Sequence, residues 1–455
     1  MTRQTNAFGN SRRNFIRNSS VVSLGFLGLH RFAFSASLAQ GMHRVYDRYG
    51  PLLPDPDGIM NLPKGFSYKI ISRRGDQMDD GLISPGRNDG MATFEGPGGK
   101  VIIIRNHEVT SDDVENGPFG ENRELLSKID RSFVYDYGFG KNPSLGGTTT
   151  LVYNEATRKV ELEYLSLAGT IRNCAGGPTP WGSWLTCEET YESRKDGQNE
   201  QNHGYVFEVP ASAQINPVKP VALKAMGRFN HEAVAVDPET GIVYQTEDRH
   251  DGLIYRFIPN QPGKLSAGGK LQALAIKGEK SFDTRNWEQT TIEAGKPLDV
   301  EWIDMEDVDS PVENLHLRGF DQGAARFARG EGMWMGNQEV YFACTNGGKE
   351  KQGQVFRFTP RSGKLELFAE PNDKELLRHC DNLTVSPWGD VVLSEDNESP
   401  RIVGITPGGE IFHLAHNVGY KSELAGVVFS PSGKTLFVNI QHAGLTLAIT
   451  GPWNG

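Results

Sequence analysis

Three segments of the chain repeat one short pattern, and this repetition limits the possible folds more than any other feature of the sequence. Residues 233–248, 383–396 and 427–439 each hold an apolar run, a turn containing Pro and Gly, and a second apolar run. Such a turn between two apolar runs predicts a β-hairpin. Hairpins that recur along a chain are typical of β-propeller blades. We therefore expect an all-β fold, a β-propeller with six blades and with loop and helical insertions.

Further short apolar runs, separated by turn residues, predict strands along most of the chain. The expected strands are residues 66–72, 100–105, 148–153, 160–164, 181–186, 205–209, 232–237, 241–246, 252–257, 340–343, 354–359, 383–385, 390–394, 401–406, 425–429 and 435–440. Two acidic segments, 108–137 and 292–317, lie outside this pattern, and residues 122–133 have some helical spacing. We expect both segments to be insertions over the propeller faces.

The N-terminus resembles an export signal of the twin-arginine type. Arg12 and Arg13 precede an apolar run at 21–29, and Ser37-Leu38-Ala39 suits cleavage after Ala39. The run is too short to remain as a membrane span, so we expect no stable membrane insertion. The expected organisation is a signal peptide at 1–39, recognised by the twin-arginine export machinery, an extended lead-in at 40–64 and one propeller domain at 65–455. The mature protein is then periplasmic or secreted.

The charge balance limits the partners of the chain. Its formal net charge is −10 at pH 7, and removal of an arginine-rich signal makes the mature chain still more acidic. An acidic protein binds nucleic acids and anionic membranes poorly, so we expect no nucleic-acid partner. The same balance suits a protein that collects cations.

The segment from Thr170 to Thr190 concentrates residue types that bind metals. Cys174 is followed by a Gly-Gly-Pro-Thr-Pro sequence, expected to be a turn, and by a strand that leads to Glu188 and Glu189. A soft thiolate and a hard carboxylate would then face one pocket. A buried structural cysteine beside two solvated glutamates is the alternative, because free Cys is often buried. Cys174 is expected to be free, and the disulfide state of Cys187, Cys344 and Cys380 is left open.

The ends of the predicted hairpins carry a second set of polar residues. A hairpin returns the chain to its starting side, so the residues on either side of it gather at the mouth of a propeller channel. The candidate metal ligands placed there are Glu232, Glu247, Asp381, Asn382 and Glu395. Each could instead be a solvated strand end. His107 and His231 precede glutamates in Asn-His-Glu triplets, and strand alternation points them to the opposite face, which favours a structural role over zinc binding.

Motifs along nearly the whole chain, from about Gly65 onward, resemble the PhoX-type alkaline phosphatase family. They include Arg105–Glu108, Asn173–Gly177, Trp184–Thr190, Phe229–Ala233, Arg329–Trp334, Asp381–Leu383 and the tail from Ala425 to Trp453. The resemblance implies a propeller whose channel holds an iron and calcium cluster, Fe3+ and Ca2+, and hydrolyses phosphate monoesters. It also implies that small-molecule phosphate esters are the substrates and that export follows the twin-arginine route.

The resemblance assigns roles to individual residues, and it adds Asn106 and Glu108 to the candidate metal ligands by their position in the Arg105–Glu108 motif. The family's iron-binding thiolate matches Cys174, its nearby carboxylate ligand matches Glu189, and its paired arginine and glutamate match Arg329 and Glu331. The expected catalytic set is therefore Arg329, Cys174 and Glu331. Arg329 would grip the phosphoryl oxygens, and a metal-bound oxide or hydroxide would attack, because cations neutralise the ester oxygens and lower the pKa of a bound water.

Two other functions fit a propeller with acidic loops. A calcium-dependent lactonase or organophosphate esterase would use carboxylate and amide ligands, but it would need neither the thiolate of Cys174 nor Arg329. A non-catalytic periplasmic propeller that binds proteins is the third possibility. It would have little reason to gather Glu, Asp and Asn at one end of the hairpins.

Overall fold

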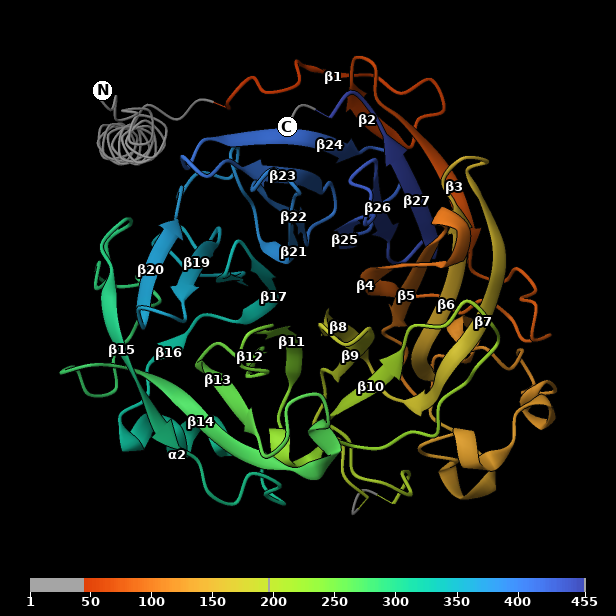
Figure 1. Cartoon of the computed structure of the whole chain (residues 1–455), viewed down its shortest axis with the longest axis horizontal. Helices are drawn as coiled ribbons and strands as arrows, with labels where there is room; N and C mark the ends of the chain where they lie inside the picture. Colours follow the sequence, from red (N-terminus) through yellow and green to blue (C-terminus); the bar gives the residue numbers. More distant parts are fainter. Residues whose placement is uncertain (1–44, 195–196, 454–455) are drawn as a thin grey trace, which may run out of the picture.

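Strands radiate from a common centre in the computed structural model, which describes residues 45–194 and 197–453 (Figure 1). The expected signal peptide at 1–39, and the lead-in up to residue 44, lie outside the described residues. Within them the fold is all-β and propeller-like, which confirms the predicted class. One α-helix, α2 (Leu315–Gln322), occurs in the described part. None of the described helices is long and apolar enough to span a bilayer.

Five antiparallel sheets make up the ring. The first contains β4 (Asn88–Glu95), β5 (Val101–His107), β6 (Gly146–Asn154) and β7 (Lys159–Thr170). The second contains β8 (Asn173–Pro178), β9 (Ser183–Glu188) and β10 (Val206–Pro210). Short 3-10 turns lie between strands at Pro97–Gly99, Val114–Asn116, Leu126–Lys128, Arg131–Phe133, Gly138–Gly140, Lys224–Met226 and Leu265–Ala267.

The third sheet has ten strands and two halves. One half runs outward through β11 (His231–Val236), β12 (Val243–Glu247), β13 (Gly252–Pro259) and β14 (Gly269–Ile276). The other half runs outward through β17 (Gly330–Gly336), β18 (Glu339–Cys344), β19 (Gln354–Thr359) and β20 (Lys364–Ala369). The strand β15 (Leu298–Asp304) pairs with β14 and β20 and joins the two outer edges, and β16 (Arg326–Phe327) pairs with β13.

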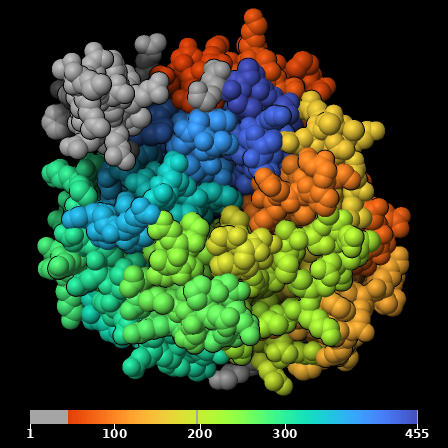
Figure 2. All heavy atoms as spheres, in the orientation of Figure 1, coloured from red at the N-terminus to blue at the C-terminus, as the bar shows by residue number. Residues whose placement is uncertain are grey.

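The last two sheets combine both ends of the described chain. One contains β21 (Cys380–Val385), β22 (Val391–Glu395), β23 (Arg401–Ile405), β24 (Ile411–Asn417), β2 (Met60–Pro63) and β1 (Leu52–Leu53). The other contains β25 (Leu424–Phe429), β26 (Thr435–Ile440), β27 (Leu445–Thr450) and β3 (Ser67–Arg73). β3 pairs with β27 as the outermost strand of the last sheet, so a strand from the N-terminal part of the chain completes a sheet of C-terminal strands and closes the ring. Figure 2 shows these ends, in red and blue, side by side at the rim.

Apolar side chains between neighbouring sheets hold the ring together. Phe327, Phe342 and Phe356 pack between sheet halves, with the rings of Phe342 and Phe356 stacked at a centroid separation of 5.1 Å. Every residue of β5 is buried, because both faces of that strand are covered. Burial of this kind stabilises the fold by about 25 cal/mol per Å² of apolar surface.

Most predicted strands are confirmed, and three predictions about local structure are wrong. Gly176, Gly177 and Pro178 belong to β8, and the turn lies at 179–182. The acidic segment 292–317 is no insertion outside the pattern, since it supplies β15 and the start of α2. Alternating acidic and apolar residues, typical of a half-exposed strand, account for its composition. Residues 122–133 form two 3-10 turns instead of a longer helix.

Candidate metal centre

The six strands nearest the centre share one irregularity in their pairing. They are β4, β8, β11, β17, β21 and β25 (Figure 1). Each has a register shift near its first residues, as where Asn88 pairs with His107 but the next paired residue, Met91, faces Arg105. An extra residue of this kind forms a β-bulge, which bends a strand and turns a side chain out of its usual alternation.

The bulges carry acidic or thiol side chains in five of these strands. The residues are Asp89, Cys174, Glu232, Glu331 and Asp381, each the second residue of its strand. Three of them, Glu232, Glu331 and Asp381, have ligand atoms within 4.8 Å of one another, although they come from three different strands. The bulged residues of these three strands therefore converge at the centre of the ring.

A second group lies beside the first. Glu108, Cys174 and Glu189 also have ligand atoms within 4.8 Å of one another. Glu108 directly follows β5 and Glu189 directly follows β9, the strands that pair with the inner strands β4 and β8. This group therefore combines Cys174 from an inner strand with the residues that follow two second strands of the sheets. The expectation that Cys174 and Glu189 face one pocket is confirmed as geometry. All four cysteines of the chain are free thiols.

Glu232 tests whether these groups suit a metal ion. Its side chain is fully buried, and neither carboxylate oxygen has a hydrogen-bond partner among the described residues. Burial, followed by the nearby charge of Glu331, raises the pKa of Glu232 well above its usual range. An unpartnered buried carboxylate is costly unless a cation compensates it. The donor set therefore fits a metal ion.

Burial also raises the pKa values of the other acidic and thiol groups around Glu232. Removal from water and the charge of Asp89, whose carboxylate oxygen lies 3.8 Å from Sγ, raise the pKa of the Cys174 thiol. Burial likewise raises the pKa of Asp381 to about 8 and the pKa values of Asp89 and Glu331 well above their usual range. Metal ions would reverse these shifts, because they favour the deprotonated ligands.

Arg329 borders the first group in a fixed orientation. Its Nε and Nη2 atoms donate to the two carboxylate oxygens of Asp248 at 2.8 and 2.7 Å, and Nη2 lies 2.9 Å from Glu331. Its backbone is left-handed, with φ at 53°, a conformation that non-glycine residues seldom adopt. The side chain remains 31% exposed. Arg329 therefore presents a rigid, partly open cation next to the buried acids.

Four of the expected ligands lie outside both groups. Glu247 accepts from Leu253 N at 3.1 Å and from the Tyr255 hydroxyl at 2.8 Å. Glu395 accepts from the backbone N–H of Arg378 and of Arg401 and from the Arg401 side chain. Each of these glutamates is the last residue of a second strand, so its carboxylate holds the next loop of its own sheet.

The two asparagines are also engaged. Asn106 donates to the carbonyls of Cys174 and Ala175 and accepts from Trp184, so it fixes the backbone of the thiol. Asn382 accepts from Gly426 N at 2.6 Å and joins two inner strands. Both histidines are structural as expected, since the rings of His107 and His231 bond to the carbonyls of Gly86 and Gly227.

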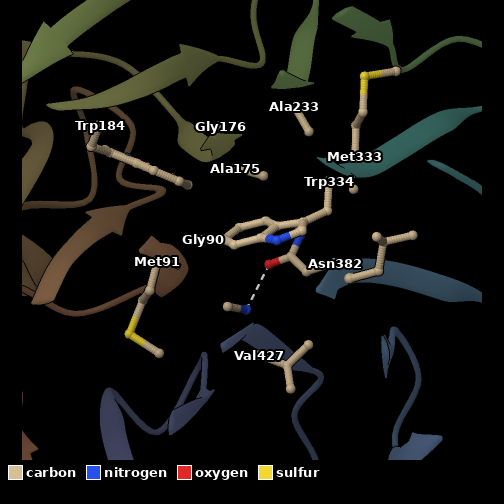
Figure 3. A pocket seen from close by; sticks show the side chains of 13 residues that line it. Gly90, Met91, Ala175, Gly176, Trp184, Ala233, Met333, Trp334, Asn382 and Val427 are labelled. Carbon is tan, nitrogen blue, oxygen red and sulfur yellow. Dashed lines mark hydrogen bonds between the residues drawn. The ribbon is translucent and has the colours of Figure 1, made fainter. Parts of the chain in front are cut away.

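Small residues and the side chain of Trp334 narrow the centre of the ring. The lining includes Gly90, Ala175, Gly332 and Trp334, which surround a cavity of about 10 Å³, roughly the space of one water molecule. Figure 3 shows the Trp334 indole across this space, next to Asn382 and its hydrogen bond to Gly426. A Cβ on Gly332 would lie 2.6 Å from the Cα of Asn382, so this close approach requires glycine. The centre is filled here rather than open.

Comparison with known proteins decides the family of this chain. A family model described as alkaline phosphatase PhoX matches residues 47–444, which is most of the sequence. The chain belongs to the PhoX family of alkaline phosphatases. It is thus a phosphatase, as the motifs around Cys174 and Arg329 predict. No curated protein sequence matches the chain.

The structure of Pseudomonas fluorescens PhoX shares the fold of this PhoX family member, and two other solved structures are less similar. Pseudomonas fluorescens PhoX in complex with vanadate, a transition state analogue, is 19% identical with a TM-score of 0.63, covering 90% of this chain and 98% of that one. A gluconolactonase from Xanthomonas campestris is 12% identical with a TM-score of 0.42, covering 90% and 100% of the two chains. A luciferin-regenerating enzyme is 10% identical with a TM-score of 0.42, covering 85% and 96%.

Several charged residues of this PhoX centre are absent from the sequence-based set. Asp89, Arg172 and Asp248 are the main ones, and Glu423, just before β25, is another acid whose pKa is raised by removal from water. A signal for Asp89 exists in the sequence, because Arg87-Asn88-Asp89-Gly90 repeats the form of Arg172-Asn173-Cys174-Ala175. Both tetrapeptides enter an inner strand at its bulge.

Proposed function

We propose that this phosphatase hydrolyses phosphate monoesters at metal ions held by the two acidic groups. The observation that carries the proposal is Glu232, fully buried with both oxygens unpartnered and within 4.8 Å of Glu331 and Asp381. Such a carboxylate suits a cation in the assembled enzyme. Vanadate bound to Pseudomonas fluorescens PhoX supports a phosphoryl-transfer site in the shared fold.

The donor types support iron and calcium. Cys174 offers a thiolate, and Glu189 and Glu108 offer carboxylates, a mixture that ferric iron accepts. Glu232, Glu331 and Asp381 offer oxygen ligands alone, which calcium prefers. When bound, the metals would neutralise the ester oxygens and lower the pKa of the attacking water, giving the oxide or hydroxide nucleophile expected from the sequence.

The residues of the chain supply positioning and charge. Arg329, fixed by Asp248 and Glu331, would donate to non-bridging phosphoryl oxygens with the part of its guanidinium that remains exposed. A donor held in place before the reaction stabilises developing charge without reorganisation. Trp334 and the small residues beside it would keep water out of the centre of the ring next to the site.

We also propose six blades and an exported enzyme. Six equivalent backbone bonds support the count, because the residue after each second strand donates to the residue before its inner strand. These bonds are Glu108 to Arg87, Glu189 to Arg172, Asp248 to Asn230, Thr345 to Arg329, Asp396 to His379 and Gln441 to Glu423. The ten-stranded sheet is then two blades joined by β15. Export through the twin-arginine route rests on the motif at 11–39.

Cys174→Ala tests the proposed centre. We expect the exported, metal-loaded protein to hydrolyse a chromogenic aryl phosphate, and the variant to lose bound iron and at least about tenfold in kcat, since one metal ligand is gone. Cys187→Ala is the matched control. Its thiol is fully buried in an apolar cluster, so we expect lower stability but unchanged kcat.

Two results would count against this account. Wild-type hydrolysis retained in Cys174→Ala, with iron still bound, would remove the thiolate from the centre. A metal-loaded wild type that hydrolyses lactones but no phosphate ester would refute the monoester proposal.

A further inference from the structure

Arg172 and Arg329 occupy equivalent positions in the ring. Each directly precedes an inner strand, β8 or β17, and each has a left-handed backbone, with φ at 49° and 53°. The N–H of Arg172 donates to the carbonyl of Val109 at 3.2 Å, and the N–H of Arg329 donates to the carbonyl of Arg249 at 2.9 Å. Val109 and Arg249 each follow an acidic residue that pairs with the arginine.

The two guanidinium groups also use the same atoms. In Arg172, Nε and Nη2 donate to Glu108 at 2.9 and 2.6 Å, and Nη2 donates to Glu189 at 2.5 Å. The corresponding atoms of Arg329 bond to Asp248 and Glu331. In both residues Nη1 donates to no described residue, and the side chains are 38% and 31% exposed. Each arginine therefore keeps donors for a ligand.

Glu189 links the surroundings of the two arginines. It pairs with Arg172, and burial together with the charge of nearby Asp248, the residue that holds Arg329, raises the pKa of the Glu189 carboxyl. The charges of Glu331, Asp248 and Glu189 together raise the pKa of Arg329. The rim of the centre thus runs through Glu108, Arg172, Glu189, Asp248, Arg329 and Glu331, with an arginine on each side of the Glu189–Asp248 pair.

On the basis of the proposed function, we propose that Arg172 is a second phosphoryl-binding residue, which holds the phosphate group together with Arg329. The non-bridging oxygens of a phosphate monoester accept more hydrogen bonds than one guanidinium edge supplies. Two arginines, each fixed by two carboxylates, would contact different oxygens. Glu108 and Glu189 then position Arg172, in the way that Asp248 and Glu331 position Arg329.

Titration of the metal-loaded protein with inorganic phosphate tests this role, with metal content measured on the same samples. Arg172→Gln removes the charged donors, so we expect phosphate affinity to fall about tenfold with metal content retained. Arg172→Lys keeps the charge but not the planar edge, and a loss of about threefold is expected. If Arg172→Gln does not fold, Arg172→Lys alone decides the outcome.

Arg87→Gln is the matched control. Arg87 precedes the inner strand β4 with φ at 50°, but its side chain pairs with Asp113 at 3.3 Å and with no member of either acidic group among the described residues. We expect its phosphate affinity to stay within about twofold of wild type, because no proposed phosphate contact is lost.

Three outcomes would overturn or separate the claims. Wild-type phosphate affinity in both Arg172 variants, with metals bound, would refute the role of Arg172. Loss of metal in Arg172→Gln would also refute it, since Arg172 would then serve the ligands and not the phosphate. If Arg329→Gln also binds phosphate normally, or the wild type binds none, the proposed function itself fails.

Discussion

Replacing Arg329 with glutamine is expected to lower kcat for aryl phosphate hydrolysis by about 100- to 1000-fold. The size follows from losing one fixed donor to developing negative charge. Glu331 would also lose its cationic partner, and the pKa of this carboxyl, already raised by burial, would rise further. The measurement is kcat and KM for the metal-loaded variant, with metal content determined in parallel.

Arg249→Gln provides the control for that experiment. Arg249 lies one residue beyond Asp248, but its side chain pairs with Glu313 at 2.5 Å and lies near Asp251. This ion pair is partly exposed and contributes little, so kcat should change less than about threefold. A similarly small change in Arg329→Gln would exclude Arg329 from transition-state binding.

Glu232→Gln should have opposite effects on the metal-free and metal-loaded protein. In the metal-free protein the free energy of unfolding should stay equal or rise by about 1–2 kcal/mol, because a neutral amide replaces a buried carboxyl without partners. Adding metals should not raise the thermal stability of the variant, because a ligand is missing. For the same reason its activity should be at least about 100-fold below wild type. Thermal unfolding with and without metals measures both effects.

Glu247→Gln is the matched control, a buried glutamate on the neighbouring strand. Its carboxylate accepts from Leu253 N and the Tyr255 hydroxyl, so the change should destabilise both forms by about 1.5–3 kcal/mol and leave metal content unchanged. The reverse pattern, with Glu232→Gln destabilising the metal-free protein and Glu247→Gln losing metal, would contradict the assignment of these two residues.

The paired acids show what can and what cannot be predicted from the sequence. Glu188-Glu189, Glu247-Asp248 and Glu395-Asp396 all follow apolar runs, and the pattern marks them as a group. In the first two pairs the first acid holds backbone of its own sheet, and the second faces the mouth. The sequence alone does not say which member faces which way, because that depends on the loops that follow each strand.

The inner strands show a second limit. β4, β8 and β17 begin with glycine-rich sequence around Gly90, Gly176 and Gly332, which carries little strand signal. Their glycines are required where neighbouring inner strands approach closely, as Gly332 approaches Asn382. The three hairpins that begin with the inner strands β11, β21 and β25 are predictable from local pattern. The bulges that bring Asp89, Cys174 and Glu232 to the centre depend on long-range packing instead.

Metal analysis combined with activity is the most direct test of the central claim. The protein, purified in folded form after export, should contain bound iron and calcium. Chelation that removes them should abolish aryl phosphate hydrolysis, and returning the metals should restore it. Full activity in protein shown to be metal-free would contradict the account.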